Sequence, residues 1–306
     1  MSRAAEIDIE AMFADARADD GARTVRVGLV GKGVQKSRTP AMHEAAGRAH
    51  GLNYRYRLLD TAAMDPAPPL REIIAVADAH GYAGLNVTYP YKVEIVALLD
   101  ELSDAAESIG AVNTLVLRNG RRSGHNTDMW GFAESFRRNM AEVSRDTVVL
   151  LGAGGAGAAV AHALADCNAG TTLIIDADRD KAEALARAVS ARHGAARAEA
   201  VGDAAEAVAR ADGLVNATPV GMAALPGMPV PVDLLRRDMW VADIVYFPIE
   251  TELLRAARAL GCRTLSGAGM AIFQAVRAFE LFTGLKPDVE RMTAVFKSFD
   301  ETAPTS

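Results

Sequence analysis

Cysteine is scarce in this chain of 306 residues, with Cys167 and Cys262 as its two copies. They lie far apart, and neither belongs to a CxxC pair or to a Cys/His spacing typical of zinc ligands. A disulfide framework and a metal site are therefore not expected. A reducing compartment fits best, and we expect a cytoplasmic protein.

The chain also lacks excess positive charge and long hydrophobic runs. Its 33 Lys and Arg residues against 39 Asp and Glu give a formal net charge of −6, so nucleic acid and anionic membranes are not expected as partners. No stretch reaches the roughly 20 apolar residues of a membrane span. Residues 1–20 are acidic, lack a signal-peptide pattern and are expected to form a flexible leader. The expected partner is a small molecule, bound by a monomer or homodimer.

Strand and helix patterns alternate along the rest of the chain, and 50% hydrophobic content is sufficient for two domain cores. Asn119-Gly120 favours a type I′ turn and predicts a hairpin. The expected elements of the first domain are strands at 25–30, 54–58 and 84–88, helices at 40–50, 70–79 and 92–99, and the hairpin of 114–117 with 122–125.

A second alternation begins at residue 147 and predicts a doubly wound, Rossmann-type domain. The expected strands lie at 147–151, 171–175, 198–201, 213–216 and 240–245, and the helices start at 155 and lie at 179–192, 203–210 and 251–260. Two last helices, about 269–283 and 287–298, are expected to return to the first domain. The predicted fold is α/β, with a substrate-binding, catalytic domain at 21–126 plus 270–306 and a nucleotide-binding domain at 127–269.

A glycine-rich turn opens the second domain. The run Gly152-Ala153-Gly154-Gly155-Ala156-Gly157 follows an apolar strand and precedes an alanine-rich helix, the setting in which GxGxxG binds a dinucleotide pyrophosphate. Asp176 ends the next strand, where an acid binds the ribose hydroxyls and repels a 2′-phosphate. NAD is therefore favoured over NADP. Helix capping is the alternative role of Asp176, and Asp178 is better placed for it.

Lys92 and Asp128 are the candidates for proton transfer. Lys92 follows a strand end and opens an expected helix, where the helix dipole disfavours a cation. Ligands of open α/β sheets bind at such strand ends, although a solvent-exposed surface lysine is the alternative. Asp128 is expected to be both functional and cap-like, at the start of the helix that carries Trp130 and Phe132.

Four other polar residues carry weaker signals when they are taken alone. His43 and His125 are expected to be structural and not catalytic. Ser37 is an ordinary loop residue, and Thr39 is a candidate helix N-cap before Pro40.

Several separate blocks of residues resemble the shikimate dehydrogenase superfamily over essentially the whole ordered chain. The blocks are 37–43 (SRTPAMH), 84–92 (GLNVTYPYK), 110–114 (GAVNT), 124–128 (GHNTD), 216–222 (NATPVGM), 243–246 (DIVY) and 267–270 (GAGM), with Gln274 one helical turn later. The resemblance implies a substrate domain, a nucleotide domain and final helices that return to the substrate domain.

The resemblance also implies roles for individual residues. Lys92 and Asp128 match the catalytic dyad, and Ser37 and Thr39 match the hydroxyls that hold the substrate carboxylate. Residues implied to bind the remainder of the substrate are Asn86, Thr88, Asn113, Asp128 and Gln274. Besides the glycine turn and Asp176, the implied cofactor residues are Lys181, Thr218, Tyr246, Gly267 and Met270.

Two departures from the biosynthetic shikimate enzymes refine the expectation. Thr39 replaces the second serine of Ser-x-Ser-Pro, and residues 176–178 (DAD) replace the Asn-Arg-Thr segment that binds the NADP phosphate. The chain thus resembles NAD-dependent quinate/shikimate dehydrogenases of catabolic pathways. The alternatives are an NADP-dependent biosynthetic shikimate dehydrogenase and a non-catalytic quinate sensor.

Overall fold

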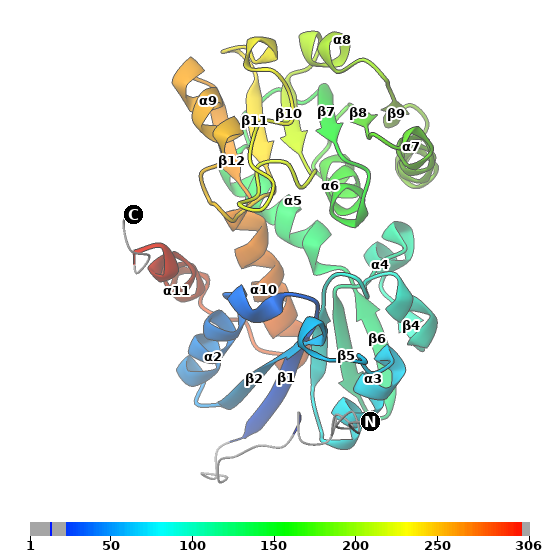
Figure 1. Cartoon of the computed structure of the whole chain (residues 1–306), viewed down its shortest axis with the longest axis vertical. Coiled ribbons are helices and arrows are strands. Elements are labelled where there is room, and N and C mark those ends of the chain that lie inside the picture. Colours follow the sequence, from blue (N-terminus) through cyan, green and yellow to red (C-terminus); the bar gives the residue numbers. More distant parts are fainter. Residues whose placement is uncertain (1–12, 14–22, 302–306) are drawn as a thin grey trace, which may run out of the picture. The chain divides into compact units, whose positions relative to one another are not determined.

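The computed structural model describes residue 13 and residues 23–301, which form two compact units (Figure 1). Unit 1 comprises Met1–Thr127 with Ala275–Ser306, and unit 2 comprises Asp128–Gln274. The leader expected over residues 1–20 lies outside the described residues except for Phe13, which is buried in the core of unit 1. Among the described residues, no helix is both long enough and apolar enough to cross a membrane.

Unit 1 is built on a mixed sheet in the order β2-β1-β3-β5-β6-β4. Strands β1, β2 and β3 pair in parallel, and β5 and β6 form an antiparallel hairpin. Its turn residues Asn119 and Gly120 have φ of 53° and 71°, the positive values that a type I′ turn requires, so the predicted hairpin is confirmed. The strands are β1 (Thr24–Gly31), β2 (Asn53–Asp60), β3 (Gly84–Val87), β4 (Glu101–Leu102), β5 (Thr114–Arg118) and β6 (Arg121–His125).

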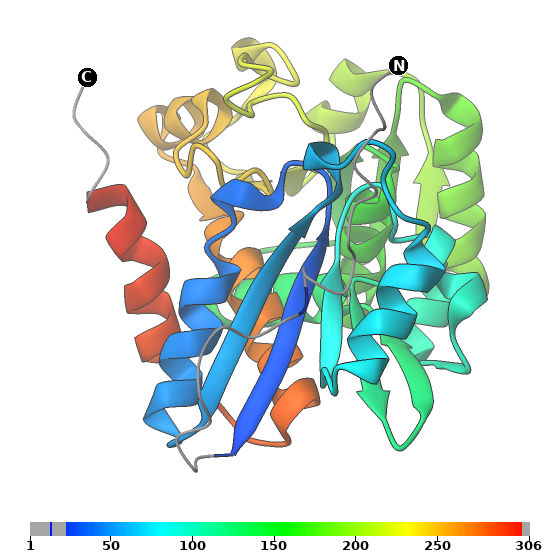
Figure 2. The ribbon, with the colours of Figure 1, turned by 60° about the horizontal axis from the view of Figure 1, so that its bottom comes forward.

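Helices pack on both faces of this sheet, because side chains alternate along each strand. Leu85 of β3 joins a core with α3 (Leu70–Ala79), whereas a Cβ on Gly84 would meet the Phe282 ring of α10 (Ala268–Thr283). Helix α11 (Val289–Glu301) packs against α2 (Thr39–Ala49), as Figure 2 shows. The predicted return of the C-terminal helices is confirmed. Shorter elements are η1 (Val34–Lys36), η2 (Thr61–Ala63), η3 (Glu94–Leu98) and α4 (Asp104–Ile109).

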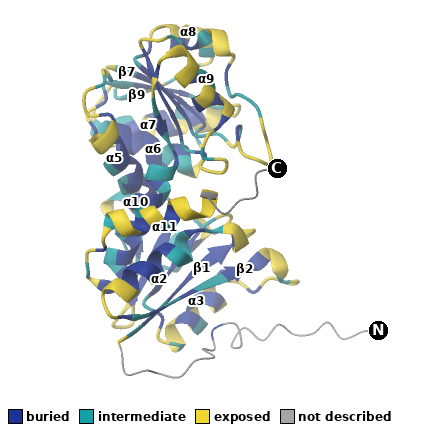
Figure 3. Cartoon of the chain, turned by 90° about the vertical axis from the view of Figure 1, so that its left-hand side faces the viewer, coloured by how far each residue is buried: buried dark blue, intermediate teal, exposed yellow. Residues whose placement is uncertain are grey.

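Unit 2 has a parallel sheet in the order β12-β11-β10-β7-β8-β9, the doubly wound order in which the winding reverses between β7 and β10. Figure 3 shows buried strands and exposed outer helix faces. The strands are β7 (Thr147–Leu151), β8 (Thr171–Ile175), β9 (Ala198–Ala200), β10 (Gly213–Asn216), β11 (Trp240–Asp243) and β12 (Arg263–Ser266). The helices are α5 (Thr127–Asn139), α6 (Gly155–Asp166), α7 (Arg179–His193), α8 (Ala204–Ala209), η4 (Val232–Leu234) and α9 (Glu252–Leu260).

Three local expectations near the candidate site are wrong. Lys92 does not open a helix: it lies in a turn before η3, because its carbonyl accepts the Val112 N–H at 2.8 Å instead of a helical bond. Thr39 is not an N-cap but the first residue of α2, after Arg38, which makes no side-chain capping bond. Asp128 is not at the N-cap position of α5, because it lies inside the first turn of a helix that begins at Thr127.

Candidate functional site

The glycine turn of unit 2 has the geometry that a pyrophosphate needs. Gly152 has a φ of 98°, and a Cβ on Gly157 would lie 2.0 Å from the Gly152 carbonyl oxygen, so both positions require glycine. Gly154 precedes α6 as its N-cap, and a Cβ on Gly154 or Gly155 would meet nothing within 4 Å. Open space at a helix N-terminus lets the backbone approach a phosphate. The residues present therefore fit a dinucleotide.

Asp176 follows β8 and holds this turn in place. Its Oδ2 accepts the Ala153 N–H at 2.7 Å, and its Oδ1 accepts the Asp178 N–H at 2.8 Å. Asp178 caps α7 by accepting the Lys181 N–H, as predicted, and the Lys181 Nζ lies 3.2 Å from the same carboxylate. Asp176 thus has a structural role that the sequence did not reveal. Because a carboxylate offers about four acceptor sites, it keeps capacity for ribose hydroxyls.

The loop after β10 lies against the glycine turn. A Cβ on Gly152 would be 2.8 Å from the Ala217 carbonyl oxygen. Asn216 Oδ1 accepts the Thr218 N–H at 3.0 Å and the Thr218 hydroxyl at 2.7 Å. The ends of β7 and β10 flank the point where the winding of the sheet reverses, so the topology brings Gly152 and the loop of Thr218 together.

Asp243, at the end of β11, is a buried carboxylate that the sequence did not single out as a site residue. Its Oδ1 accepts from Asn216 Nδ2 and from the Val245 N–H, each at 3.0 Å, and its Oδ2 accepts from the Thr251 hydroxyl at 2.7 Å. Burial raises the pKa of Asp243 to about 6, against the effect of these bonds. Because Thr251 caps α9 and Asn216 holds Thr218, Asp243 links the loops that follow β10 and β11. The sequence offered one signal for this residue, because Asp243 is an acid at the end of the apolar strand β11.

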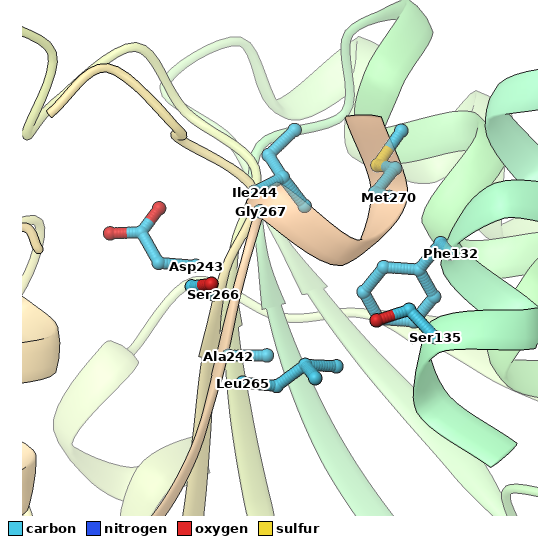
Figure 4. Close-up of a pocket in the computed structure, with 9 residues that line it drawn as sticks. All are labelled: Phe132, Ser135, Ala242, Asp243, Ile244, Leu265, Ser266, Gly267 and Met270. Carbon is cyan, nitrogen blue, oxygen red and sulfur yellow. The ribbon is translucent and has the colours of Figure 1, made fainter. Parts of the chain in front are cut away.

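A narrow hollow of unit 2 contains two of the candidate nicotinamide residues. Met270 and Gly267 line it together with Phe132, and the carboxylate of Asp243 points away from them (Figure 4). The side chains that line the hollow fill most of it, and they come from α5, α10 and the ends of β11 and β12. A Cβ on Gly267 would lie 2.1 Å from the Ile244 carbonyl oxygen, which makes glycine obligatory there. The third candidate, Tyr246, is 43% exposed.

In unit 1, Thr88 and Lys92 flank the turn after β3, and both are half-buried. The Thr88 N–H donates to the Val30 carbonyl at 3.0 Å, which ties this turn to β1. Gly31 leaves room for the turn, because a Cβ there would lie 2.2 Å from the Thr88 methyl group. Backbone bonds to Val30 and Val112 therefore hold this turn at both of its ends.

Asn86 and Asn113 share a buried polar network. Asn86 Oδ1 accepts from the Tyr56 hydroxyl at 2.8 Å, and Asn86 Nδ2 donates to the Thr114 hydroxyl at 3.0 Å. Asn113 Oδ1 accepts the Thr127 N–H at 2.7 Å, and Asn113 Nδ2 donates to the Thr127 hydroxyl at 3.0 Å. The structure therefore brings the two predicted amides together and uses much of their hydrogen-bonding capacity internally.

Ser37 and Thr39 flank the start of α2, and both are half-buried. The Thr39 N–H donates to Ser37 Oγ at 3.3 Å. His43, one helical turn later, is fully buried and bonds the Tyr54 hydroxyl through Nδ1 at 2.9 Å. Burial lowers the pKa of His43 to about 3. This histidine has the packing of a structural residue.

His125, in β6, is half-buried, with its Nε2 3.4 Å from the Ser123 hydroxyl. Burial, and then the nearby Arg277 charge, lower the pKa of His125. Its imidazole therefore stays neutral near pH 7.

The candidate residues are divided between the two units. Unit 1 offers the side-chain amine of Lys92 and the amides and hydroxyls suited to a polyol. Unit 2 offers the phosphate-binding turn and Asp176. Asp128 and Gln274 belong to unit 2 and stand next to the two chain junctions, with Asp128 buried and Gln274 Nε2 donating to the Ala271 carbonyl at 3.1 Å. These residue types together suit oxidation or reduction of a polyhydroxylated compound with a dinucleotide.

Two family models match the chain. Residues 29–115 match the "Shikimate dehydrogenase substrate binding domain", and residues 267–295 match the "Shikimate 5'-dehydrogenase C-terminal domain". The first match lies within unit 1 and covers the candidates from Ser37 to Asn113. The second covers Gly267, Met270 and Gln274.

Curated relatives match almost along their entire length. The chain is 49% identical over 280 residues to a shikimate dehydrogenase (NADP(+)) of Streptomyces avermitilis, which covers 90% of this chain and 96% of the relative. It is also 49% identical over 281 residues to a quinate/shikimate dehydrogenase (NAD(+)) of Corynebacterium efficiens, and this match covers 90% of this chain and 98% of the relative. A solved structure of quinate dehydrogenase from Corynebacterium glutamicum in complex with NAD has 46% identity and a TM-score of 0.87, covering 90% of this chain and 99% of that one.

Proposed function

Because the chain belongs to the shikimate dehydrogenase family, we propose that it oxidises a ring hydroxyl of quinate or shikimate to the 3-dehydro ketone, with NAD as its cofactor. The cofactor, when bound, supplies the hydride acceptor. Relatives of equal identity carry both NAD and NADP in their names, so the cofactor must be argued from this chain's own residues.

In this proposal Lys92 takes the proton of the reacting hydroxyl, and Asp128 orients the lysine and shares the proton. The position of Lys92 after a strand end, on a turn held by backbone bonds, supports this role. General acid–base catalysis of this kind contributes about 10²–10⁴ in rate.

The remaining polar residues would bind the substrate. Ser37 and Thr39 would hold the carboxylate, and the acceptor and donor sites that Asn86 and Asn113 keep, with Thr88 and Gln274, would bind ring hydroxyls. The buried bonds of Asn86 and Asn113 support this role, because amides held by internal partners keep one orientation.

The choice of NAD rests on one observation: the carboxylate of Asp176 accepts a hydrogen bond from the glycine turn. The Asp176 carboxylate lies just after β8, where the family's NADP enzymes bind a phosphate. Its negative charge would repel a 2′-phosphate at that position. Lys181 does not cancel this charge, because it pairs with Asp178.

A steady-state matrix of quinate and shikimate against NAD and NADP tests the proposed function. We expect turnover of at least one substrate, with a higher kcat/KM for NAD than for NADP. A preference for NADP with shikimate would instead support a biosynthetic shikimate dehydrogenase. Binding of quinate without any turnover would support a sensor.

Thr39→Ser is expected to shift the quinate-to-shikimate ratio of kcat/KM toward shikimate. Serine keeps the hydroxyl and removes one methyl group, a change worth about 1–3 kcal/mol or 10–200-fold at most in a packed pocket. Quinate bears one more hydroxyl at C1, so the shape near the carboxylate affects it most. Parallel assays of both substrates on wild type and variant provide the ratio.

A change in helix capping cannot explain such a shift, because Thr39 does not cap α2. An unchanged ratio would contradict the specificity role of Thr39 and leave the dehydrogenase assignment in place.

A further inference from the structure

Arg38 stands between Ser37 and Thr39 in the sequence, yet its side chain is bound to the C-terminal helix. The guanidinium donates through Nη1 to the Phe296 carbonyl at 2.9 Å and to Asp300 Oδ2 at 2.8 Å, and through Nη2 to Asp300 Oδ1 at 2.5 Å. It also lies over the Phe296 ring, 4.7 Å from its centroid. Helices α2 and α11 lie side by side in Figures 1 and 2.

The contact of Arg38 with Asp300 and Phe296, called the clamp below, differs from an exposed surface ion pair. The Arg38 side chain is 8% exposed, whereas Asp300 is 43% exposed. Two parallel bonds between an arginine and a carboxylate determine orientation as well as distance. These bonds tie the start of α2 to α11.

The chain just before Ser37 is held by a second contact, at the end of β2. Asp60, at the end of β2, accepts the Gly33 N–H through Oδ1 at 2.8 Å. The same oxygen accepts the Ala62 N–H at 3.1 Å. Ser37 and Thr39 therefore lie on a short stretch that is held at one end by β2 and in its middle by α11.

We propose that Arg38 and Asp300 are positioning residues for the substrate carboxylate: the clamp on α11 sets the distance and direction of the Ser37 and Thr39 hydroxyls that receive it. This inference rests on the proposed function, because it takes these hydroxyls as the carboxylate site. It extends the site to a helix whose residues follow Thr39 by about 250 positions in the chain. Arg38 acts through its neighbours, since its own guanidinium is occupied by Asp300 and Phe296.

Asp300→Asn is the variant of choice, because Asp300 is half-exposed and asparagine keeps the size of the side chain while it removes the charge. We expect the KM for quinate or shikimate to rise about 3- to 10-fold, with kcat within about 2-fold of wild type and the KM for NAD unchanged. Glu290→Gln is the matched control, since it removes the same charge from the exposed first turn of α11. The control is expected to match wild type.

A second substrate probe separates positioning from general destabilisation. The methyl ester of the substrate lacks the carboxylate charge, so its competitive inhibition constant should change less than 2-fold on Asp300→Asn. Equal weakening of acid and ester would overturn the inference in favour of a structural role. A fall in the KM for the acid would also overturn it, because Arg38 would then bind the carboxylate directly once released.

Arg38→Lys completes the test, since lysine keeps the charge and loses the planar fork. The double variant with Asp300→Asn should have about the KM of Arg38→Lys alone, because both changes break one clamp. If wild type turns over neither substrate with either cofactor, the proposed function fails. If wild type is active and Asp300→Asn behaves like Glu290→Gln, the clamp has no role in binding.

Discussion

Lys92→Ala is expected to lower kcat by about 10²–10⁴-fold and to leave the Kd for NAD nearly unchanged. The proton of the reacting hydroxyl needs an acceptor in the transition state, and alanine removes it. The glycine turn and Asp176 belong to unit 2, whereas Lys92 belongs to unit 1, so the variant keeps the residues proposed to bind the cofactor. Single-turnover rates and NAD titration by fluorescence measure the two quantities separately.

The fold should tolerate this change, because the turn that carries Lys92 is held by main-chain bonds to Val30 and Val112. Lys286→Ala is a control that removes an exposed lysine from the same unit. If Lys92→Ala retains turnover near that of Lys286→Ala, or if its NAD affinity collapses, the lysine is structural.

Asp128→Asn extends the same test. If Lys92 and Asp128 share one proton, their effects are strongly non-additive, and the double variant should be about as slow as Lys92→Ala alone. Additive losses would show that the two residues act separately.

Asp176→Asn is expected to lower kcat/KM for NAD and to narrow the preference for NAD over NADP. The loss has two causes, which are a missing acceptor for the ribose hydroxyls and a backbone N–H of Ala153 or Asp178 left without its carboxylate partner. The Ala153 bond is partly buried and the Asp178 bond is exposed, so water replaces part of what is lost and the expected cost is about 1 kcal/mol, or roughly 5-fold in affinity. With NADP, removal of the Asp176 charge also removes its repulsion of the 2′-phosphate, which offsets part of the loss in kcat/KM. The ratio of kcat/KM values for the two cofactors is the measurement.

Asp180→Asn is the matched control, because it removes a negative charge from the exposed first turn of α7 and leaves the pair of Asp178 and Lys181 in place. It is expected to leave the cofactor ratio near that of wild type. If both variants shift the NAD-to-NADP ratio of kcat/KM equally, the total charge at this turn sets the cofactor preference. If wild type prefers NADP, Asp176 does not select NAD.

The order of elements and the chemical inventory of the site could be predicted from the sequence, because both are local properties. Strands β7, β8 and β10 and helix α3 have the predicted bounds, since apolar runs and flanking turn residues define them without distant partners. The hairpin at Asn119 and the close approach of Gly152 and Gly157 follow equally from local residue types.

The predictions that were wrong concern residues whose partners are distant in the chain. Lys92 has the sequence context of a helix start, but its carbonyl bonds Val112 instead. Thr39 has the context of an N-cap, but α2 begins one residue earlier than predicted, after a residue bound to α11.

The sequence by itself determined the family resemblance, the two-unit α/β fold and the set of residues able to handle a polyol and a dinucleotide. Only the tertiary structure decided which of those residues carry internal bonds: Asp176 to the glycine turn, Asn86 to Tyr56, and Arg38 to Asp300. The physical reason is that a buried polar group needs a hydrogen-bond partner, while its local sequence does not specify which distant residue supplies it. Packing brings Arg38 and Asp300 together across 262 positions of the chain.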